Sequence, residues 1–404
     1  MAAHEGIDKY KARNDNLREI WRGARPNPKH LLGYDAATIS HHTFVFGDLN
    51  YRVRVQVDDD SHEAKVAKAM ELVQAKDFET LYAMDELTAG IDKKELLYQF
   101  QTPPCHFSPT FKMLREPGFH YKAQRVPRYV QRMPPHNTRL AGTEKQIHTH
   151  VFPACHTYSL SNSYTDRILF ASAENLSDKL KNLVYEPCPD FASSDHKPIR
   201  GVFSIDLNRP TTVTESTMTE PVSLVFRDIS CKDLPPMDVD GSSDPYVLFV
   251  CDPVDLVQDD RSAKERKGKS YKVGSFEWPS TAYRTKTLNP TWDEKVKLHV
   301  PSVTASRMDG AMLFLTVMDY DVASQDDTIC VLQLNLKDLV TLGAGEKSKT
   351  VAFSRPLLKY GQQRGTIDFT VDIRQEGSEN AGAKGKRGGF FSRLSKKWSR
   401  AKMP

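Results

Sequence analysis

The chain has 404 residues, enough for two or three domains with buried cores. No run of about 18 apolar residues occurs and the N-terminal segment MAAHEGIDKYKARND is charged, so we expect neither a membrane span nor a signal peptide. Six cysteines without a Cys-x-x-Cys pair predict a reduced, cytoplasmic protein. The net charge of +4 is unevenly distributed along the chain, because residues 381–404 contain eight Lys or Arg and no acid. The rest of the chain is therefore mildly acidic.

The first half predicts mixed α and β structure. Apolar spacing over residues 5–20 and over residues 61–90 is helical, with Gly90 as a stop. The apolar run HTFVF predicts a buried strand that ends in Gly47, Asp48 and Asn50 and continues in VRVQV. RILFAS and GVFSI predict two further short strands, while residues 101–163 are rich in Pro, Arg and His and predict long loops.

Five motifs in this half follow one another in a meaningful order. They are the Ala-His pair with RNDN near the start, FVFGDLNYR, FSPTFK, YTDRILF and SSDHKPI. Together they resemble the second half of the inositol polyphosphate 5-phosphatase domain, over residues 1–206. The resemblance implies an α+β four-layer β-sandwich of the endonuclease/exonuclease/phosphatase type, N-terminally incomplete here.

Hydrolysis of a phosphate ester needs a positioned water, a proton acceptor, and groups that stabilise negative charge. Asp48 would hold the water, the Asn50 amide would donate to phosphoryl oxygens, and His196 would transfer a proton or contact phosphate. The resemblance implies that Asp166 pairs with His196 and that Asp195 lies near the metal and the water. Each acid alone is more often a turn cap or a surface acid, but as a set these residues favour the catalytic function.

The same motifs predict substrate contacts. The candidates are basic residues of these segments: Lys112, Arg125, Arg167 and Lys197. Phe111 and Ala123 replace the tyrosine and lysine usual in the family. The family's metal-binding glutamate and asparagine lie upstream of the Ala-His segment, at which this sequence starts. The resemblance therefore implies Mg²⁺ chemistry without the principal glutamate ligand, and we expect weak or absent turnover of the chain as given.

An insertion over about residues 130–162 separates two of the motifs. Within it, HTHVFPACH places three histidines and a cysteine close together, at His148, His150, Cys155 and His156. These residue types can bind zinc, but their spacing matches no standard structural site. We therefore predict no metal site there.

The second half predicts an all-β antiparallel sandwich. Short alternating strands follow a Thr-rich linker, which we place at residues 207–219. LPPMDVDGSSDPYV and MDYDVASQDD, with TLNPTWDE between them, resemble the calcium-binding loops of a C2 domain, over residues 220–375. The five aspartates of that pattern are present: Asp238, Asp244, Asp319, Asp321 and Asp327. Five clustered carboxylates repel one another unless cations neutralise them, and Ca²⁺ prefers carboxylate oxygens, so we predict Ca²⁺ binding. Acidic loops without metal are the alternative.

Residues 376–404 form a basic tail. On a helix its apolar residues would share one face, opposite basic residues, which predicts an interfacial membrane helix. The predicted membrane-binding residues are Phe390, Phe391, Leu394, Trp398, Lys396 and Lys397. A calmodulin-target helix and a nuclear-localisation cluster are the alternatives.

Three functions remain open. The first is a phosphoinositide 5-phosphatase recruited to anionic membranes by calcium and a basic tail, and the second is an inactive protein that binds phosphoinositides and membranes. The third, a nuclease of the same superfamily, is disfavoured because no groove with interleaved basic and aromatic residues is evident. We therefore predict phosphoinositides and anionic membranes as partners, no nucleic acid, and a cytoplasmic location peripheral to membranes.

Overall fold

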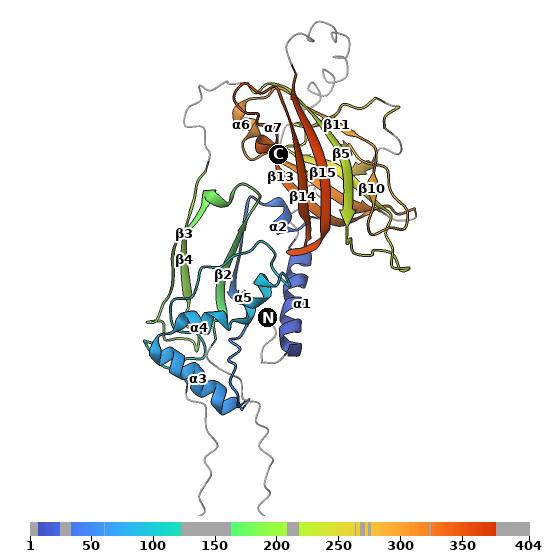
Figure 1. Cartoon of the computed structure of the whole chain (residues 1–404). Helices are drawn as coiled ribbons and strands as arrows, with labels where there is room; N and C mark the ends of the chain where they lie inside the picture. Colours follow the sequence, from blue (N-terminus) through green and yellow to red (C-terminus); the bar gives the residue numbers. More distant parts are fainter. Residues whose placement is uncertain are drawn as a thin grey trace, which may run out of the picture.

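The computed structural model describes residues 7–24, 34–59, 61–122, 163–207, 218–262, 264–266, 271–273, 276–322 and 325–376. In Figure 1 the blue-to-green segments form a layered α and β part, and the yellow-to-red strands form a curled sheet beside it. The predicted insertion with its histidine cluster, Arg125 and the basic tail lie outside the described residues.

The first part is an α+β unit, as predicted. Its elements in chain order are α1 (Ile7–Gly23), α2 (Ala36–Ile39), β1 (His42–Asp48), α3 (His62–Ala75), α4 (Phe78–Ala83), α5 (Glu86–Asp92), β2 (Asp166–Ser172), β3 (Leu180–Pro187) and β4 (Ile199–Ile205), with a 3₁₀ turn at Ser177–Lys179. The predicted continuation VRVQV is not a strand, since only Val53 makes a bridge, to Asp85. The helical stretch 61–90 divides into three helices, because Ser61, Asp77 and Asp85 each cap a new N-terminus.

Two antiparallel ribbons, β1–β2 and β3–β4, pack against each other through aromatic rings. The Phe203 ring of β4 lies 5.0 Å from Phe44 and 5.2 Å from Phe170, centroid to centroid. Leu17 and Trp21 of α1 pack on the β1–β2 side, in a core with Leu49 and Tyr51. The ribbons and helices therefore hold the end of β1 and the start of β2 in one place.

Two adjacent buried acids bind the layers together. Asp85 accepts a hydrogen bond of 2.6 Å from the fully buried Arg167 and also caps α5 through Thr88. Glu86 accepts hydrogen bonds from buried Arg13 at 2.5 Å and from Arg54 at 2.6 Å. Buried charges are tolerated only when they are paired in this way.

The second part is the predicted all-β sandwich. Its strands are β5 (Val222–Lys232), β6 (Pro245–Asp252), β7 (Gln258–Asp259), β8 (Tyr271–Val273), β9 (Phe276–Trp278), β10 (Thr291–Trp292), β11 (Val296–Val300), β12 (Met312–Asp319), β13 (Asp327–Asn335), β14 (Ser348–Lys359) and β15 (Gln362–Gln375), with short helices α6 (Ala305–Met308) and α7 (Leu336–Val340). The main sheet runs β6-β12-β13-β14-β15-β5-β11-β7 and curls around one large apolar core. Thr219 of the predicted linker donates to the Val303 carbonyl, so the sandwich begins slightly before β5.

The two parts contact each other directly. The Tyr34 ring is buried in the sandwich core, 5.4 Å from Phe314, and its hydroxyl bonds to Thr316. One carboxylate oxygen of Asp35 caps α2, and the other accepts a 2.6 Å hydrogen bond from the Tyr360 backbone in the β14–β15 turn. Figure 1 shows this turn beside α1 and α2. These contacts tie the sandwich to the first part.

Among the described residues, the structure shows neither a disulfide nor a membrane-spanning helix. Cys105, Cys188, Cys231, Cys251 and Cys330 are free thiols. No helix described here is both long and apolar enough to cross a membrane.

The Asp85–Arg167 pair gives a test of the interior. In Asp85→Ala, Arg167 keeps its buried charge without its partner, so we expect the free energy of unfolding to fall by about 3–5 kcal/mol. Asp77 is the matched control, because it caps α4 through the same two contacts with a threonine but lies nearer to solvent. Urea unfolding should show a clearly smaller loss in Asp77→Ala. Equal losses in the two variants would mean that Asp85 acts only as a cap.

Candidate functional site

The candidate active site lies where β1 ends and β2 begins. Asp48 and Asp166 face each other in the antiparallel register of the two strands. His196, from the loop before β4, approaches them, and its Nδ1 lies 2.9 Å from Asp166 Oδ2. Residues separated by more than a hundred positions therefore meet at one rim, as the motifs predict.

Asp166 is held by three hydrogen bonds. Besides His196, the hydroxyls of Thr110 and Thr165 each donate to its Oδ2 at 3.0 Å, and both threonines are fully buried. An ionised carboxylate only accepts, so Nδ1 of His196 carries the proton and Nε2 is the basic nitrogen of the neutral ring. Asp166 thus orients the histidine and sets its tautomer.

The same pair sets the charge of the histidine. The hydrogen bond to Asp166 raises the pKa of His196 above its ordinary value; burial opposes this, while negative charge on Asp166, Asp48 and Asp195 adds to it. Partial desolvation raises the pKa of the Asp48 carboxyl, and the charge of Asp166 adds to that rise. The pKa values of both groups therefore shift toward neutral pH, where a side chain can both accept and donate a proton.

Asn50 braces Asp48 in this structure. Its backbone N–H and its side-chain amide each donate to the Asp48 carboxylate at 3.0 Å. Asn50 has a φ of 60°, a left-handed conformation that is rare outside glycine and frequent at functional sites. One amide donor is used on Asp48, which leaves the other for the phosphoryl contact predicted from the sequence.

Cations surround the aromatic wall of the site. The Phe111 ring lies 4.4 Å from the His196 ring, with the Arg52 guanidinium 5.0 Å and the Lys112 ammonium 5.9 Å from the Phe111 centroid. Arg52 also donates to the Asn50 side chain at 2.6 Å. The sequence analysis did not single out Arg52, although it ends the motif that contains Asp48 and Asn50.

Two predicted substrate contacts need correction. Arg167 is 1% exposed and pairs with Asp85, while Lys197 is 0% exposed and its ammonium donates to the carbonyls of Glu116 and Phe191 at 2.6 and 2.7 Å. Both charged ends lie in the interior and cannot reach a ligand at the rim. They are structural residues.

The described residues contain no group of three or more His, Cys, Asp or Glu arranged to hold a metal ion. Asp48, Asp166 and His196 form a hydrogen-bonding set, which does not fit the magnesium site that the family resemblance implies. Asp195 lies beside them, and its backbone carbonyl accepts from the Met113 N–H at 2.8 Å. We therefore derive no step through magnesium.

A second cluster lies at one end of the sandwich. Burial raises the pKa of the Asp319 carboxyl to about 6, and the charges of Asp238, Asp321 and Asp244 add to the rise, against a hydrogen bond from the Asp244 backbone. Asp327 faces Asp319 across β12 and β13. All five predicted aspartates thus belong to one end of the sheet, and their oxygen chemistry fits calcium. Among the described residues, no three of their carboxylates are drawn together closely enough to form a metal-ligand group.

Neighbouring residues missed by the sequence analysis shape these loops. Asp326 accepts the Tyr246 hydroxyl at 2.6 Å and the Asp321 N–H at 3.0 Å, so it braces the second loop. Lys286 donates from its backbone to Asp244 at 2.7 Å. At the loop tips, Val239 is 109% exposed and Val322 is 89% exposed.

The comparisons with known proteins agree with these two parts. The sequence model of the Endonuclease/Exonuclease/phosphatase family 2 matches residues 1–150, and that of the C2 domain matches residues 222–351. The chain therefore carries a domain of the endonuclease/exonuclease/phosphatase type followed by a C2 domain, in the predicted order.

Individual relatives match each half. Over 200 residues the chain is 24% identical to phosphatidylinositol 3,4,5-trisphosphate 5-phosphatase 2 of Canis lupus familiaris, covering 50% of this chain and 13% of that protein. Over 127 residues it is 32% identical to synaptotagmin-10 of Rattus norvegicus, covering 31% and 20%. The chain thus spans a fifth or less of the length of these relatives. The solved C2A domain of a plant extended synaptotagmin 1 has 17% identity, covers 39% of this chain and 98% of that structure, and gives a TM-score of 0.28.

The His196–Asp166 pair predicts a pH dependence. Because the pKa of His196 is raised in the folded state, the stabilisation by this pair is fully present below the ordinary histidine pKa and is lost as pH rises through the raised value. Asp166→Asn removes the negative charge, so an NMR titration of the His196 ring should move to lower pH. Asp178→Asn, at an exposed acid of the same domain, should leave the titration in place. An unchanged His196 pKa in Asp166→Asn would contradict the assignment.

Proposed function

We propose that the chain hydrolyses a phosphate monoester of an inositol lipid at anionic membranes, with the C2 domain as the calcium-dependent membrane anchor. The observation that carries the catalytic part is the Asp166–His196 pair beside Asp48, at a rim that also holds Arg52 and Lys112. The proposed reaction is the one predicted from the sequence, removal of the 5-phosphate of the inositol ring.

The residues divide the chemistry among themselves. Asp48, with its raised pKa, holds a water and accepts its proton. As the water oxygen bonds to phosphorus and the bond from phosphorus to the inositol oxygen breaks, His196, with its raised pKa, supplies positive charge and gives its proton to the departing inositol oxygen. Asp166 keeps the ring oriented. Lys112 neutralises phosphate charge as it develops, which is the main demand of phosphoryl transfer. The buried Arg52 guanidinium donates to the Asn50 side chain and so positions that amide.

The substrate class follows from charge and from similarity. Lys112 stands in FSPTFK, the segment that resembles the substrate-contacting segment of inositol phosphatases, and the relative matched over half of this chain is named for a phosphoinositide substrate. The C2 domain supports a lipid over a soluble ester, because it brings the same chain to a membrane. The preferred position on the inositol ring is the 5-phosphate.

Membrane recruitment is supported by the loop end of the sandwich. Without a cation, the negative charge of the aspartates around Asp319 repels an anionic surface. Bound calcium would neutralise this charge, and lipid phosphates could complete the coordination of the ion. Val239 and Val322 project beside the cluster and can enter the interfacial region of the bilayer. The basic tail would add a calcium-independent contribution.

A second function is favoured by one observation. The described residues hold no metal-ligand group at the phosphatase rim, so the chain can bind phosphorylated lipid there without turning it over. In that case Lys112 and protonated His196 form an anion site. The protein would then be a phosphoinositide- and membrane-binding protein without activity.

Phosphate release separates these two functions. With Mg²⁺ and vesicles containing a 4,5-bisphosphorylated inositol lipid, the proposed activity predicts release of inorganic phosphate, against the weak or absent turnover expected from the sequence alone. His196→Ala should lower the rate by about 10²–10⁴-fold, the usual contribution of a general acid or base. His299→Ala, in the C2 sheet, is the control and should retain the rate. Lipid binding without any release by the unsubstituted chain would instead support the binding protein.

Calcium should control the membrane step. Co-sedimentation with anionic vesicles should rise with calcium, and Asp319→Asn/Asp321→Asn should abolish that rise, since the cluster loses two charges. Asp368→Asn/Asp372→Asn, with the same charge change on β15, should keep the calcium response. Removal of residues 381–404 should lower binding at every calcium level, most strongly at low salt. A full calcium response in the first double variant would show that these loops do not hold the ion.

A further inference from the structure

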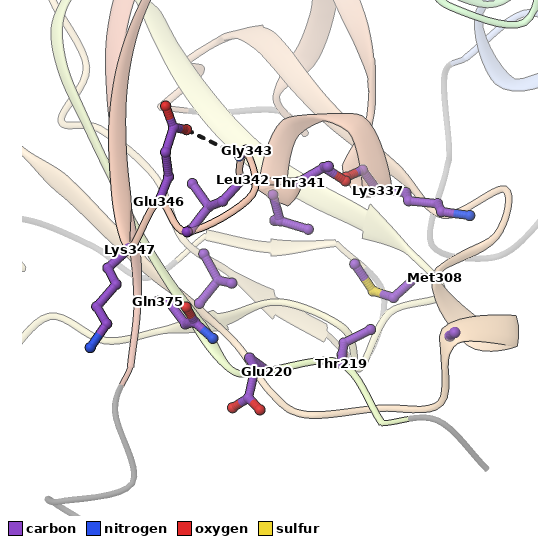
Figure 2. A pocket seen from close by; sticks show the side chains of 14 residues that line it. Thr219, Glu220, Met308, Lys337, Thr341, Leu342, Gly343, Glu346, Lys347 and Gln375 are labelled. Carbon is purple, nitrogen blue, oxygen red and sulfur yellow. Dashed lines mark hydrogen bonds between the residues drawn. The ribbon is translucent and has the colours of Figure 1, made fainter. Parts of the chain in front are cut away.

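The sandwich has a pocket at the end opposite its acidic loops. The pocket has a volume of about 460 Å³ and lies where β5 begins and β15 ends (Figure 2). This volume is in the range of sites that enclose a drug-sized ligand or an aromatic side chain. Val222, Met308 and Leu342 contribute apolar walls, and Met308 is itself part of the buried core.

The walls of the pocket are held in place. The Glu346 carboxylate accepts a 3.0 Å hydrogen bond from the Gly343 N–H, which closes the loop after α7, as Figure 2 shows. Thr341 donates from its backbone and its hydroxyl to the Lys337 carbonyl, at 3.0 and 2.7 Å. Lys337 in turn pairs with Asp309 at 2.5 Å. The pocket therefore exists before any occupant enters.

The chain itself supplies a suitable occupant next to this pocket. Gln375, the last residue of β15, lines the pocket, and the described chain ends one residue later. The Gly-rich residues 377–389 lead to Phe390 and Phe391, and at most about 55 Å of extended chain separates them from Gln375. A tether of this length keeps the aromatic segment at an effective concentration on the order of millimolar.

Charge at the rim is balanced. Glu220 and Glu346 line the pocket edge together with Lys337 and Lys347, so the edge gives the basic segment no net electrostatic attraction. Apolar burial accordingly contributes most, with the aromatic rings as anchors and the bases at the edge.

We propose that the segment Phe390–Trp398 of the same chain docks into this pocket when no membrane is present. The docked segment hides the aromatic side chains that the tail would insert into a bilayer, so an anionic membrane competes with the pocket for it. The docking itself does not depend on the proposed catalytic or lipid-binding function; only its consequence for membranes rests on that function.

Photo-crosslinking of the full chain tests the docking directly. Phe391 is replaced by photoreactive p-benzoyl-phenylalanine, and the crosslinked peptides are mapped by mass spectrometry in a mixture of isotopically light and heavy chains. We expect crosslinks within one chain, to Met308 or to the peptide that contains Leu342. Mixed light–heavy crosslinks would instead identify a second copy as the occupant, and crosslinks confined to other surfaces would also overturn the proposal.

Two pocket variants keep this test decisive. Leu342→Asp places a charge in the half-buried wall and Ala305→Trp fills the pocket, and either should reduce the intramolecular crosslink at least fivefold. Leu183→Asp, at an exposed leucine of β3, is the control and should leave it unchanged. Unaltered crosslinking in both pocket variants, with the fold intact by circular dichroism, would overturn the proposal.

The consequence for membranes has its own measurement. Binding to vesicles with an anionic lipid content of about one third, measured without calcium, should increase severalfold in Leu342→Asp because the tail is released. If the intramolecular crosslinks to the pocket form but vesicle binding does not increase, the docking stands and its effect on membrane binding is excluded. Loss of the crosslinks would overturn the docking, whatever the vesicles show.

Discussion

The first domain depends on two neighbouring buried carboxylates, Asp85 and Glu86. Neither can remain charged in the interior without partners, and each finds an arginine on a different element. Glu86 also accepts the Arg52 backbone N–H at 3.1 Å, and Asp85 bonds the arginine that directly follows Asp166. The acids therefore hold both chain segments that present the candidate active site, although neither acid belongs to it.

A second constraint joins the two domains. Tyr34 enters the core of the sandwich, and Asp35 bonds both to its own helix and to the β14–β15 turn. Arg355 of β14 adds an ion pair with Glu174 at 3.0 Å. The turn approaches so closely that a side chain at Gly361, where φ is +66°, would lie 3.1 Å from the Trp21 ring nitrogen. The domains thus pack as neighbours with specific contacts.

The sequence predicts the rim groups well because each belongs to a short motif with its own local geometry. Asp48 and Asn50 end an apolar strand, and Asp319 and Asp321 end another, so their positions follow from strand boundaries. Arg167 and Lys197 were misassigned because each directly follows a rim residue, and successive side chains of an extended segment point to opposite sides. When Asp166 faces the rim, Arg167 must face the interior.

Long-range pairing is what local patterns could not supply. Asp85 and Glu86 lie in a stretch with ordinary helical spacing. The arginine that pairs with Asp85 is 82 positions away in the sequence, and Arg13, which pairs with Glu86, is 73 positions away. In the same way, no local signal distinguishes Asp326, which braces the loop, from Asp327, which faces Asp319 across the sheet. Only the fold assigns these roles.

The central claim is that one chain combines hydrolysis at the His196 rim with calcium-dependent capture of the membrane that carries the substrate. The most direct measurement compares phosphate release from a 4,5-bisphosphorylated inositol lipid in anionic vesicles with release from its soluble headgroup, each with and without calcium. We expect calcium to accelerate phosphate release from vesicles and to leave phosphate release from the soluble headgroup unchanged. An equal effect of calcium on both substrates, or turnover of the soluble headgroup alone, would contradict it.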